Sequence, residues 1–495
     1  MTALTPATYG AAVASRLFAC GLFVVAADFL FYGHDIGWTV GLFCFALLCA
    51  SAFYAPAAIR HPHSWVLFAI CVALCLMLVE TVNWLAFALF WLFFAALFTD
   101  MRLAQAPLTW LRKVAAFVFN AAGGAAFSDG RTCSRHWKRT RGGGVLAMLF
   151  SGWFLPAAVG AVFLMLFASA NPVIETWLLA FDWRIIDNLL TPPRMMFWFV
   201  AGVAIWGVLR ASRIRIADRP IGMEPSPASP LIAFLFARDG VIRSLVIANA
   251  LFLGQNLLDA NFLWGGAALP QGITHAQYAH RGAYPLIMTA LLAAAFILVT
   301  MRRGGGLDEN RTIRALIYVW LLQNLVLVAS SIWRTDLYVA QYSLTYLRLS
   351  ALLWMGLVLV GLALIVAMMV LNKSSGWLIR ANLIATLALL LAVCPVDLGR
   401  FIANYNVEHS RGTGAARLNP DYFDMPVLTD LAYLATIGPS ALPALREANR
   451  QRNPMVTPIY SALLTRLKAE CTDWRGWTYR AHRLCKEMAA VEGAE

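Results

Sequence analysis

Long apolar runs recur along most of this chain, and no other feature limits its fold as strongly. A membrane-spanning helix needs about 20 apolar residues, because lipid cannot satisfy backbone polar groups outside a helix. Glu80 and Asn83 interrupt the longest run and predict a helical hairpin there. The expected runs are 17–33, 37–55, 64–79, 81–99, 144–169, 194–210, 242–258, 284–301, 315–332, 347–371 and 377–396. The sequence therefore predicts an all-α, polytopic transmembrane helical bundle of about 11 spans.

The composition agrees with a chain that is surrounded by lipid. Hydrophobic residues make up 60% of the 495 residues and charged residues only 13%, whereas a soluble domain averages about 25% charged residues. The 18 tryptophans and 30 phenylalanines are typical of membrane proteins, whose aromatic belts lie at the bilayer surfaces. No basic stretch is long enough, or interleaved enough with aromatic residues, to indicate a nucleic-acid partner.

The basic residues predict the side of the membrane on which each connection lies. If the N-terminus is cytoplasmic, the inside connections hold 22 lysines and arginines and the outside connections hold five. Positive loops stay in the cytoplasm, so the N-terminus is expected inside and, after an odd number of spans, the C-terminus outside. We interpret the first apolar run as an uncleaved span rather than a signal peptide.

The run at 242–258 is the weakest of the predicted spans, because it contains two asparagines and a glutamine. The basic clusters at 238–243 and 302–314 can lie on the same side of the membrane only if two spans separate them. The charge pattern therefore predicts that this run is a span. Transporters often build their binding sites from polar or broken spans of this kind.

The chain reads as ordinary soluble protein after Pro395. We expect a transmembrane domain over 1–396 and a small helical extracytoplasmic domain over 397–495, docked on the membrane part. Leucine spacing and chain-breaking residues predict helices on either side of Gly438-Pro439, and two more around 457–470 and 475–489.

Cys471 and Cys485 are the only cysteine pair in this predicted outside domain, where an oxidising compartment permits a disulfide. A bridge would close a loop worth about 3 kcal/mol in the chain-entropy model. Geometry argues against it, because on a straight helix over 475–489 Cys485 lies about 15 Å from the preceding turn, and bridged Cα atoms lie within about 7 Å. A bridge needs a late start of the last helix or an antiparallel partner. Two buried free thiols are the alternative.

The connection 102–141 carries eight basic residues, and glycine pairs lie at 123–124 and directly after it at 142–143. A positive loop of this kind is expected to contact anionic headgroups, so membrane lipids are the predicted partner. The GxxxxGK[ST] spacing is absent, and the glycines do not predict a phosphate-binding loop. His275 and His280 lack the spacing of a helical metal pair. No metal, cofactor or catalytic residue is predicted.

The stretch 331–348, SIWRTDLYVAQYSLTYLR, is the strongest candidate site. At about 100° per residue its polar side chains fall on one helical face, beside runs that face lipid. Lipid cannot satisfy such groups, so they should face protein or a wet cavity. The alternative is a solvated connector with interfacial tyrosines. The predicted ligand-binding residues are Arg334, Tyr338, Gln341, Tyr342 and Arg348, with Tyr278 and Arg281 from the preceding outer loop.

Other polar residues lie in or near the spans. Gln323 and Asn324 are expected to form hydrogen bonds between helices, and Arg380 is expected to reach the cytoplasmic headgroups. Asp28 lies near the outer end of the first span, and Asp35 follows in the turn.

Six stretches together carry a family resemblance: ADFLFYGHDIGW at 27–38, YAHRGAYPL at 278–286, RTDLYVAQYSLTYLR at 334–348, ANYNVEHS at 403–410, LAYLATIGPSALPAL at 431–445 and DWRGWTYRAHRL at 473–484. They resemble a large bacterial family of inner-membrane proteins, known as domain of unknown function 4173, and its neighbour 4153. This chain departs from the family's residue pattern at His280 and Tyr284, where the family more often has arginine and phenylalanine. The resemblance implies a polytopic inner-membrane protein with a helical tail and no established reaction.

Two classes of function fit these observations. The favoured one is a non-enzymatic cell-envelope protein of the bacterial inner membrane, for binding, transport or signalling, that recognises a polar or anionic ligand in an outer-face cleft. Arginines among tyrosines suit carboxylate or phosphate recognition. The alternative is a glycosyltransferase-like membrane enzyme acting on a lipid-linked substrate, with Asp28 or Asp35 as acid or base; it rests on analogy of layout.

Overall fold

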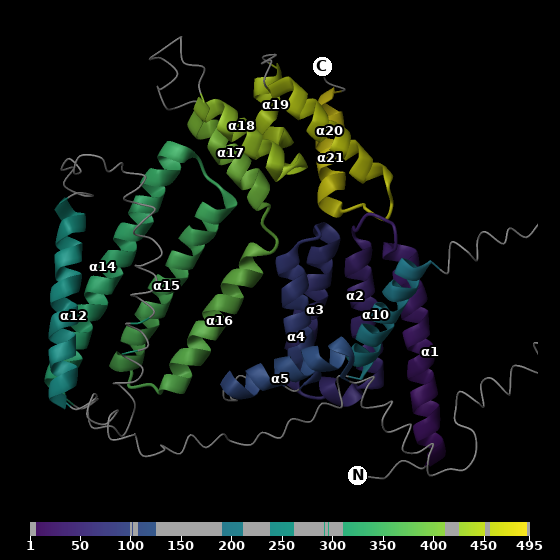
Figure 1. Ribbon diagram of the computed structural model, residues 1–495, viewed down its shortest axis with the longest axis horizontal. Helices are drawn as coiled ribbons and strands as arrows, with labels where there is room; N and C mark the ends of the chain where they lie inside the picture. Colours follow the sequence, from purple (N-terminus) through teal and green to yellow (C-terminus); the bar gives the residue numbers. More distant parts are fainter. Residues whose placement is uncertain are drawn as a thin grey trace, which may run out of the picture. The chain divides into compact units, whose positions relative to one another are not determined.

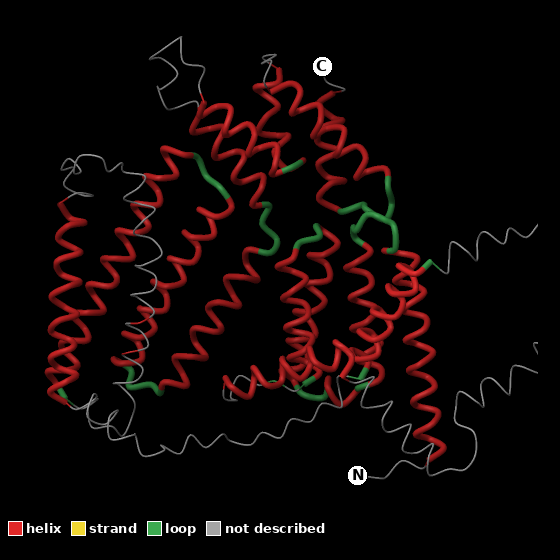
Figure 2. The backbone as a smooth tube through the Cα atoms, in the orientation of Figure 1, coloured by secondary structure: helices red, strands yellow, loops and turns green. Residues whose placement is uncertain are grey.

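A computed structural model describes residues 6–99, 101, 107–124, 191–210, 238–261, 292, 296, 310–410, 425–450 and 456–492. Throughout these ranges the regular structure is helical, with no strand (Figures 1 and 2). Seven of the described helices are long and apolar enough to cross a membrane. An all-α membrane protein is therefore confirmed. The count of about 11 spans stays a prediction, and the run at 144–169 lies outside the described residues.

The chain divides into two compact units, and the first is Met1–Asp218. In it α1 packs on α10, α2 on α3, and α3 on α4. The predicted turn at Glu80 and Asn83 is confirmed, since α3 ends at Glu80 and the Asn83 side chain accepts a hydrogen bond from the Ala86 amide at 2.6 Å. The elements of this unit are α1 (Pro6–Phe31), α2 (Thr39–Tyr54), η1 (Pro56–Ile59), α3 (Pro62–Glu80), α4 (Trp84–Phe98), α5 (Pro107–Phe119), η2 (Asn120–Gly124) and α10 (Pro192–Leu209).

Part of the basic connection 102–141 is helical. α5 and η2 lie within it, and α5 exposes apolar Leu111, Val118 and Phe119 while Lys113 is buried. The remainder, 102–106 and 125–141, lies outside the described residues. The expected contact with anionic lipid stays a prediction.

The second compact unit is Arg219–Glu495. Its long helices α12, α14, α15 and α16 pack one against the next in that order (Figure 1). Their core is apolar, with Leu245, Ile313 and Ile317 fully buried. The elements are α12 (Arg238–Asp259), α14 (Arg311–Tyr342), α15 (Tyr346–Val370), α16 (Ser375–Val393), α17 (Leu398–Ser410), α18 (Met425–Ile437), η6 (Pro439–Ala441), α19 (Leu442–Arg450), α20 (Val456–Thr472) and α21 (Tyr479–Glu492).

Helices α12 and α14 run in parallel. The Asn249 side chain donates to the Leu316 carbonyl at 3.2 Å, and Asn256 donates to the Gln323 carbonyl at 3.1 Å. The second hydrogen bond lies seven residues after the first on α12 and also seven residues after it on α14. Both helices therefore start at the same end of the unit, as the predicted shared side of their two basic clusters requires.

The last helices, α17 to α21, form a small helical tail with its own core of Leu434, Leu442, Leu445 and Leu467. The helices on either side of Gly438-Pro439 and the two that follow are confirmed. Helix α17 was not predicted. The tail belongs to the same compact unit as α12 to α16, and the proposed boundary between 396 and 397 stays a prediction.

A disulfide joins Cys471 to Cys485, with 7.0 Å between their Cα atoms. The helix expected over 475–489 begins only at Tyr479, so Cys485 lies near the start of α21 rather than far along it. Helix α20 packs against α21. The late start removes the geometric objection, and the alternative of two free thiols is wrong.

Candidate functional site

The stretch 331–348 is not one continuous helix, and the expectation of a single helical face across it is wrong. α14 ends at Tyr342, and Ser343 has a φ of 63°, a left-handed conformation that is uncommon for residues other than glycine. Thr345 then caps α15, accepting a hydrogen bond from the Arg348 amide at 3.4 Å. The chain therefore turns sharply between Arg334 and Arg348.

This turn nevertheless brings three of the predicted residues together. The Arg348 guanidinium lies over the Tyr338 ring, 4.5 Å from its centre, and the rings of Tyr338 and Tyr342 are 4.8 Å apart. Through Nη1, Arg348 donates hydrogen bonds to the carbonyls of Tyr342 and Ser343. A cation at the C-terminal end of a helix satisfies its last carbonyls and opposes its dipole. Arg348 is thus held in one orientation at the end of α14.

Arg334 lies one turn before Tyr338 and faces protein. It forms an ion pair with Asp259 at the end of α12, and the two side chains are only 4% and 1% exposed. Gln255 donates to the same carboxylate oxygen at 2.9 Å. A buried ion needs a partner of opposite charge, so Arg334 is neutralised where it lies. The sequence predicted its burial but not its partner.

The structure does not describe the side chains of three predicted site residues. Gln341 lies in the last turn of α14, and its side chain is outside the described structure. Tyr278 and Arg281 lie outside the described residues altogether. Their roles, and the ligand-binding role of the whole set, stay predictions.

A joint between α14, α15 and the tail adjoins this site, and sequence reasoning missed it. Asn406 of α17 accepts a hydrogen bond from the Leu344 amide at 2.7 Å and donates to the Leu344 carbonyl at 2.9 Å. The Tyr346 amide donates to the Tyr433 hydroxyl at 2.8 Å. Gly399 allows this close packing, because a Cβ there would lie 2.9 Å from an Ile437 methyl. The tail is therefore fastened to the loop between α14 and α15.

A row of buried polar side chains follows the contact between α12 and α14. The Asn256 hydrogen bond to the Gln323 backbone joins the two helices, whereas Asn324 donates to the Trp320 carbonyl of its own helix at 2.7 Å. The side-chain oxygens of Asn249, Asn256 and Asn324 are buried and have no hydrogen-bond partner in the described structure. We call this row, ending at Asp259 and Arg334, the polar seam.

A second Asp–Arg pair lies in the first unit. Arg194 of α10 holds both carboxylate oxygens of Asp28, one of them at 2.7 Å, and Trp198 Nε1 donates to the same group at 2.9 Å. The Tyr32 ring lies 5.1 Å from the guanidinium carbon. Both carboxylate oxygens of Asp28 are thus engaged by neighbouring side chains of α10, as expected for a structural ion pair. Asp35 lies exposed in the turn after α1.

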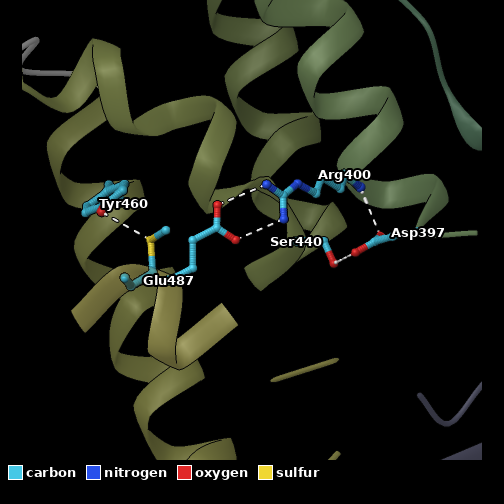
Figure 3. Close-up of polar contacts among 6 residues, drawn as sticks. Asp397, Arg400, Ser440, Tyr460 and Glu487 are labelled. Atoms are coloured by element: carbon cyan, nitrogen blue, oxygen red, sulfur yellow. Dashed lines mark hydrogen bonds and ion pairs between the residues drawn. The ribbon is translucent and has the colours of Figure 1, made fainter. Parts of the chain in front are cut away.

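Polar contacts also hold the tail together (Figure 3). Arg400 of α17 points at Glu487 of α21, and two parallel hydrogen bonds of 3.0 Å join them. Asp397 accepts from the Arg400 amide at 3.0 Å, which caps α17, and from the Ser440 hydroxyl at 3.1 Å. Among the described residues, no three His, Cys, Asp or Glu side chains gather as a metal site would require.

The apolar helices, with a buried ion pair between two of them, define a multi-pass membrane protein. A model of the family described as Domain of unknown function (DUF4153) matches residues 42–448, and the chain belongs to this family. The expected resemblance to the 4153 family is thereby confirmed. Neither a curated protein nor a solved structure matches the chain.

Proposed function

We propose that this protein binds a carboxylate or phosphate ligand at the outer end of α14, with Arg348 as its principal contact. The observation that carries the proposal is the way in which Arg348 is held. Tyr338 supports its guanidinium from one face, and the hydrogen bonds to the carbonyls of Tyr342 and Ser343 are both donated by Nη1. The Nε and Nη2 edge has the fork geometry that recognises a planar anion. An arginine fixed before binding loses little side-chain entropy when it binds.

The position of Arg348 favours signalling as the purpose of this binding. Its two carbonyl partners immediately precede Leu344, whose amide and carbonyl are both bound by Asn406 of the tail. A ligand held by the Nε and Nη2 edge of Arg348 therefore makes its contacts beside the residue to which the tail is fastened, while Nη1 keeps its two carbonyl partners. Differential contact of this kind is what coupling between a site and a distant element requires.

We further propose that the protein lies in the bacterial inner membrane with the N-terminus cytoplasmic and the C-terminus periplasmic. The 22-to-5 distribution of basic residues supports this orientation, and so does the Cys471–Cys485 disulfide, since such bonds persist in oxidising compartments. Alkaline phosphatase fused after Glu495 should be active, and the same enzyme fused within 125–141 should be inactive. The reverse pattern would place Arg348 on the cytoplasmic side.

Anion-dependent thermal stability of the purified full-length protein tests the binding site. Inorganic phosphate or succinate, compared with chloride at equal ionic strength, should raise the melting temperature of the wild type. Arg348→Gln should abolish the shift, whereas Arg112→Gln, which removes an exposed arginine of α5, should retain it. An equal shift in the Arg348 variant, or no shift with either anion in the wild type, would overturn the proposal.

Transport is the second candidate, and the polar seam favours it. Buried amide oxygens without partners, at Asn249, Asn256 and Asn324, are costly inside a membrane unless water or a solute satisfies them. Flux of phosphate or succinate into proteoliposomes distinguishes the candidates. Transport predicts flux in the wild type that Asn324→Leu removes. Binding without any flux would leave signalling as the function.

A further inference from the structure

The loop between α20 and α21 lies at the end of the tail that adjoins the last described membrane helix. Arg480, at the start of α21, donates to the Pro395 carbonyl at 3.5 Å and forms an ion pair with Asp397 at 3.5 Å. Helix α16 has the length and apolarity of a membrane span and ends at Val393. Pro395 follows two residues later. The start of α21 is therefore fixed where the chain leaves the membrane.

Exposed aromatic side chains gather at this end of the tail. We define the membrane tip as residues 473–486, which comprise the loop and the first two turns of α21. Trp474 and Tyr479 are 48% and 47% exposed. Phe401, one turn into α17, is exposed as well. Tryptophan and tyrosine prefer the headgroup level of a bilayer, where one part of the ring is apolar and the other is wet.

Basic side chains accompany these aromatic rings. The Arg475 guanidinium lies 4.6 Å from the centre of the Trp474 ring, and that of Arg483 lies 5.3 Å from Tyr479. Arg483 and Lys486 are both exposed. They follow Tyr479 at positions four and seven along α21, so the three share one helical face. Tyr479 lies nearest to the membrane end, and the cations lie one and two turns farther along.

The acidic groups near the membrane tip are already occupied by the tail itself. Asp473 accepts hydrogen bonds from the amides of Arg475 and Gly476 at 3.0 and 3.2 Å. Asp397 is bound by Arg480 and Ser440, and Glu487 by Arg400. These carboxylates therefore stabilise the fold of the tip, and the exposed side chains of Arg483 and Lys486 lie on the Tyr479 face of α21.

We propose that the membrane tip binds anionic phospholipid headgroups and seats the tail on the bilayer surface. Trp474 and Tyr479 enter the headgroup layer, and Arg483 and Lys486 meet the lipid phosphates. This site is separate from the anion site at Arg348 and does not depend on the proposed function. Each basic residue near an anionic surface strengthens binding about fivefold, which makes the contact a reinforcement of the covalent link through α16.

Hydrogen exchange of the full-length protein in nanodiscs tests the proposal. Peptides covering 473–486 should exchange more slowly in phosphatidylcholine discs that contain phosphatidylglycerol than in discs of phosphatidylcholine alone. Arg483→Gln should reduce this lipid-dependent protection about fivefold, and a double change with Lys486→Gln should reduce it further. Added salt should have the same effect as the substitutions, because it screens exposed charges.

The matched control is Arg450→Gln, at the far end of α19, which should retain the full lipid effect. Trp474→Ala should weaken protection in both kinds of disc, since it removes the part that enters the headgroup layer. Equal exchange in the two lipid compositions would overturn the proposal. Full protection in lipid-free detergent would also overturn it, because the tip would then be covered by protein.

Discussion

In each compact unit an Asp–Arg pair joins two long apolar helices, α1 to α10 in the first and α12 to α14 in the second, and these two pairs differ in how far they are removed from solvent. In Asp28–Arg194 the side chains are 12% and 22% exposed, and in Asp259–Arg334 they are 1% and 4% exposed. The first pair has added support from Trp198 and Tyr32. The second has a hydrogen bond from Gln255 and the polar seam beside it.

The comparison shows that burial decides how much stability is lost when one member of an Asp–Arg pair is removed. A pair in partial contact with solvent can lose one member, because water and ions compensate the other. A fully buried pair cannot, since removing one charge leaves the other without a partner. The two pairs therefore make a matched experiment within a single chain.

The largest effect is expected from Asp259→Asn. It keeps the size of the side chain but removes the carboxylate charge that faces the buried Arg334 guanidinium, which should cost about 3–5 kcal/mol of unfolding free energy. Unfolding of the purified full-length protein by increasing mole fractions of dodecyl sulfate, followed by circular dichroism, measures the loss.

The double variant Asp259→Leu with Arg334→Met is the control for this prediction. Replacing a buried ion pair by apolar residues of similar volume is often neutral or stabilising, so the double variant should recover most of the lost stability. If it is as unstable as Asp259→Asn, the instability comes from packing rather than from an uncompensated charge.

A smaller loss is expected from Asp28→Asn. Arg194 lies partly in solvent and keeps its contacts with the rings of Tyr32 and Trp198, so its charge does not become isolated. The same detergent titration should place this variant between the wild type and Asp259→Asn. A loss equal to that of Asp259→Asn would show that exposure does not distinguish the two pairs.

Trp198→Phe should have a still smaller effect. It removes the hydrogen bond from Nε1 to Asp28 and retains an aromatic ring beside Arg194. Loss of one such bond at a partly exposed group costs about 1 kcal/mol. Asp28→Asn combined with Trp198→Phe should cost less than the sum of the single changes, because the two residues share a contact. Strict additivity would contradict this coupling.

The smallest effect is expected from the salt concentration at which stability is measured. Raising the sodium chloride concentration should narrow the gap in stability between the wild type and Asp28→Asn, since screening acts on partly exposed charges. The gap between the wild type and Asp259→Asn should stay unchanged. A salt-dependent gap for Asp259 would mean that water reaches the polar seam at that point.

The sequence predicted the burial of Arg334 but not its partner. The cost of leaving a guanidinium in lipid required that it face protein. Asp259 lies 75 residues earlier in the chain, and no local rule pairs residues that far apart. A signal was nevertheless present, because Asp259 is the acidic residue that directly follows the most polar of the predicted spans.

The turn at Ser343 and helix α17 were missed for different reasons. Ser343 adopts a left-handed conformation without the glycine or asparagine that usually marks one, and the hydrogen bonds of Asn406 that hold the next residue, Leu344, come from tertiary structure. Helix α17 has a local signal, the cap formed by Asp397. Its apolar residues pack on two different clusters, Ala403 in the tail core and Ile402 at the joint, so no single apolar stripe marks it.

The hold of Asn406 on Leu344 has a mechanical consequence. The side-chain amide of Asn406 accepts a hydrogen bond from the Leu344 N–H at 2.7 Å and donates one to the Leu344 carbonyl at 2.9 Å. A small shift cannot release one bond and keep the other in good geometry, since each has a narrow range of angles. The two bonds are therefore expected to form and break together, and the tail moves with the end of α14 as long as they hold.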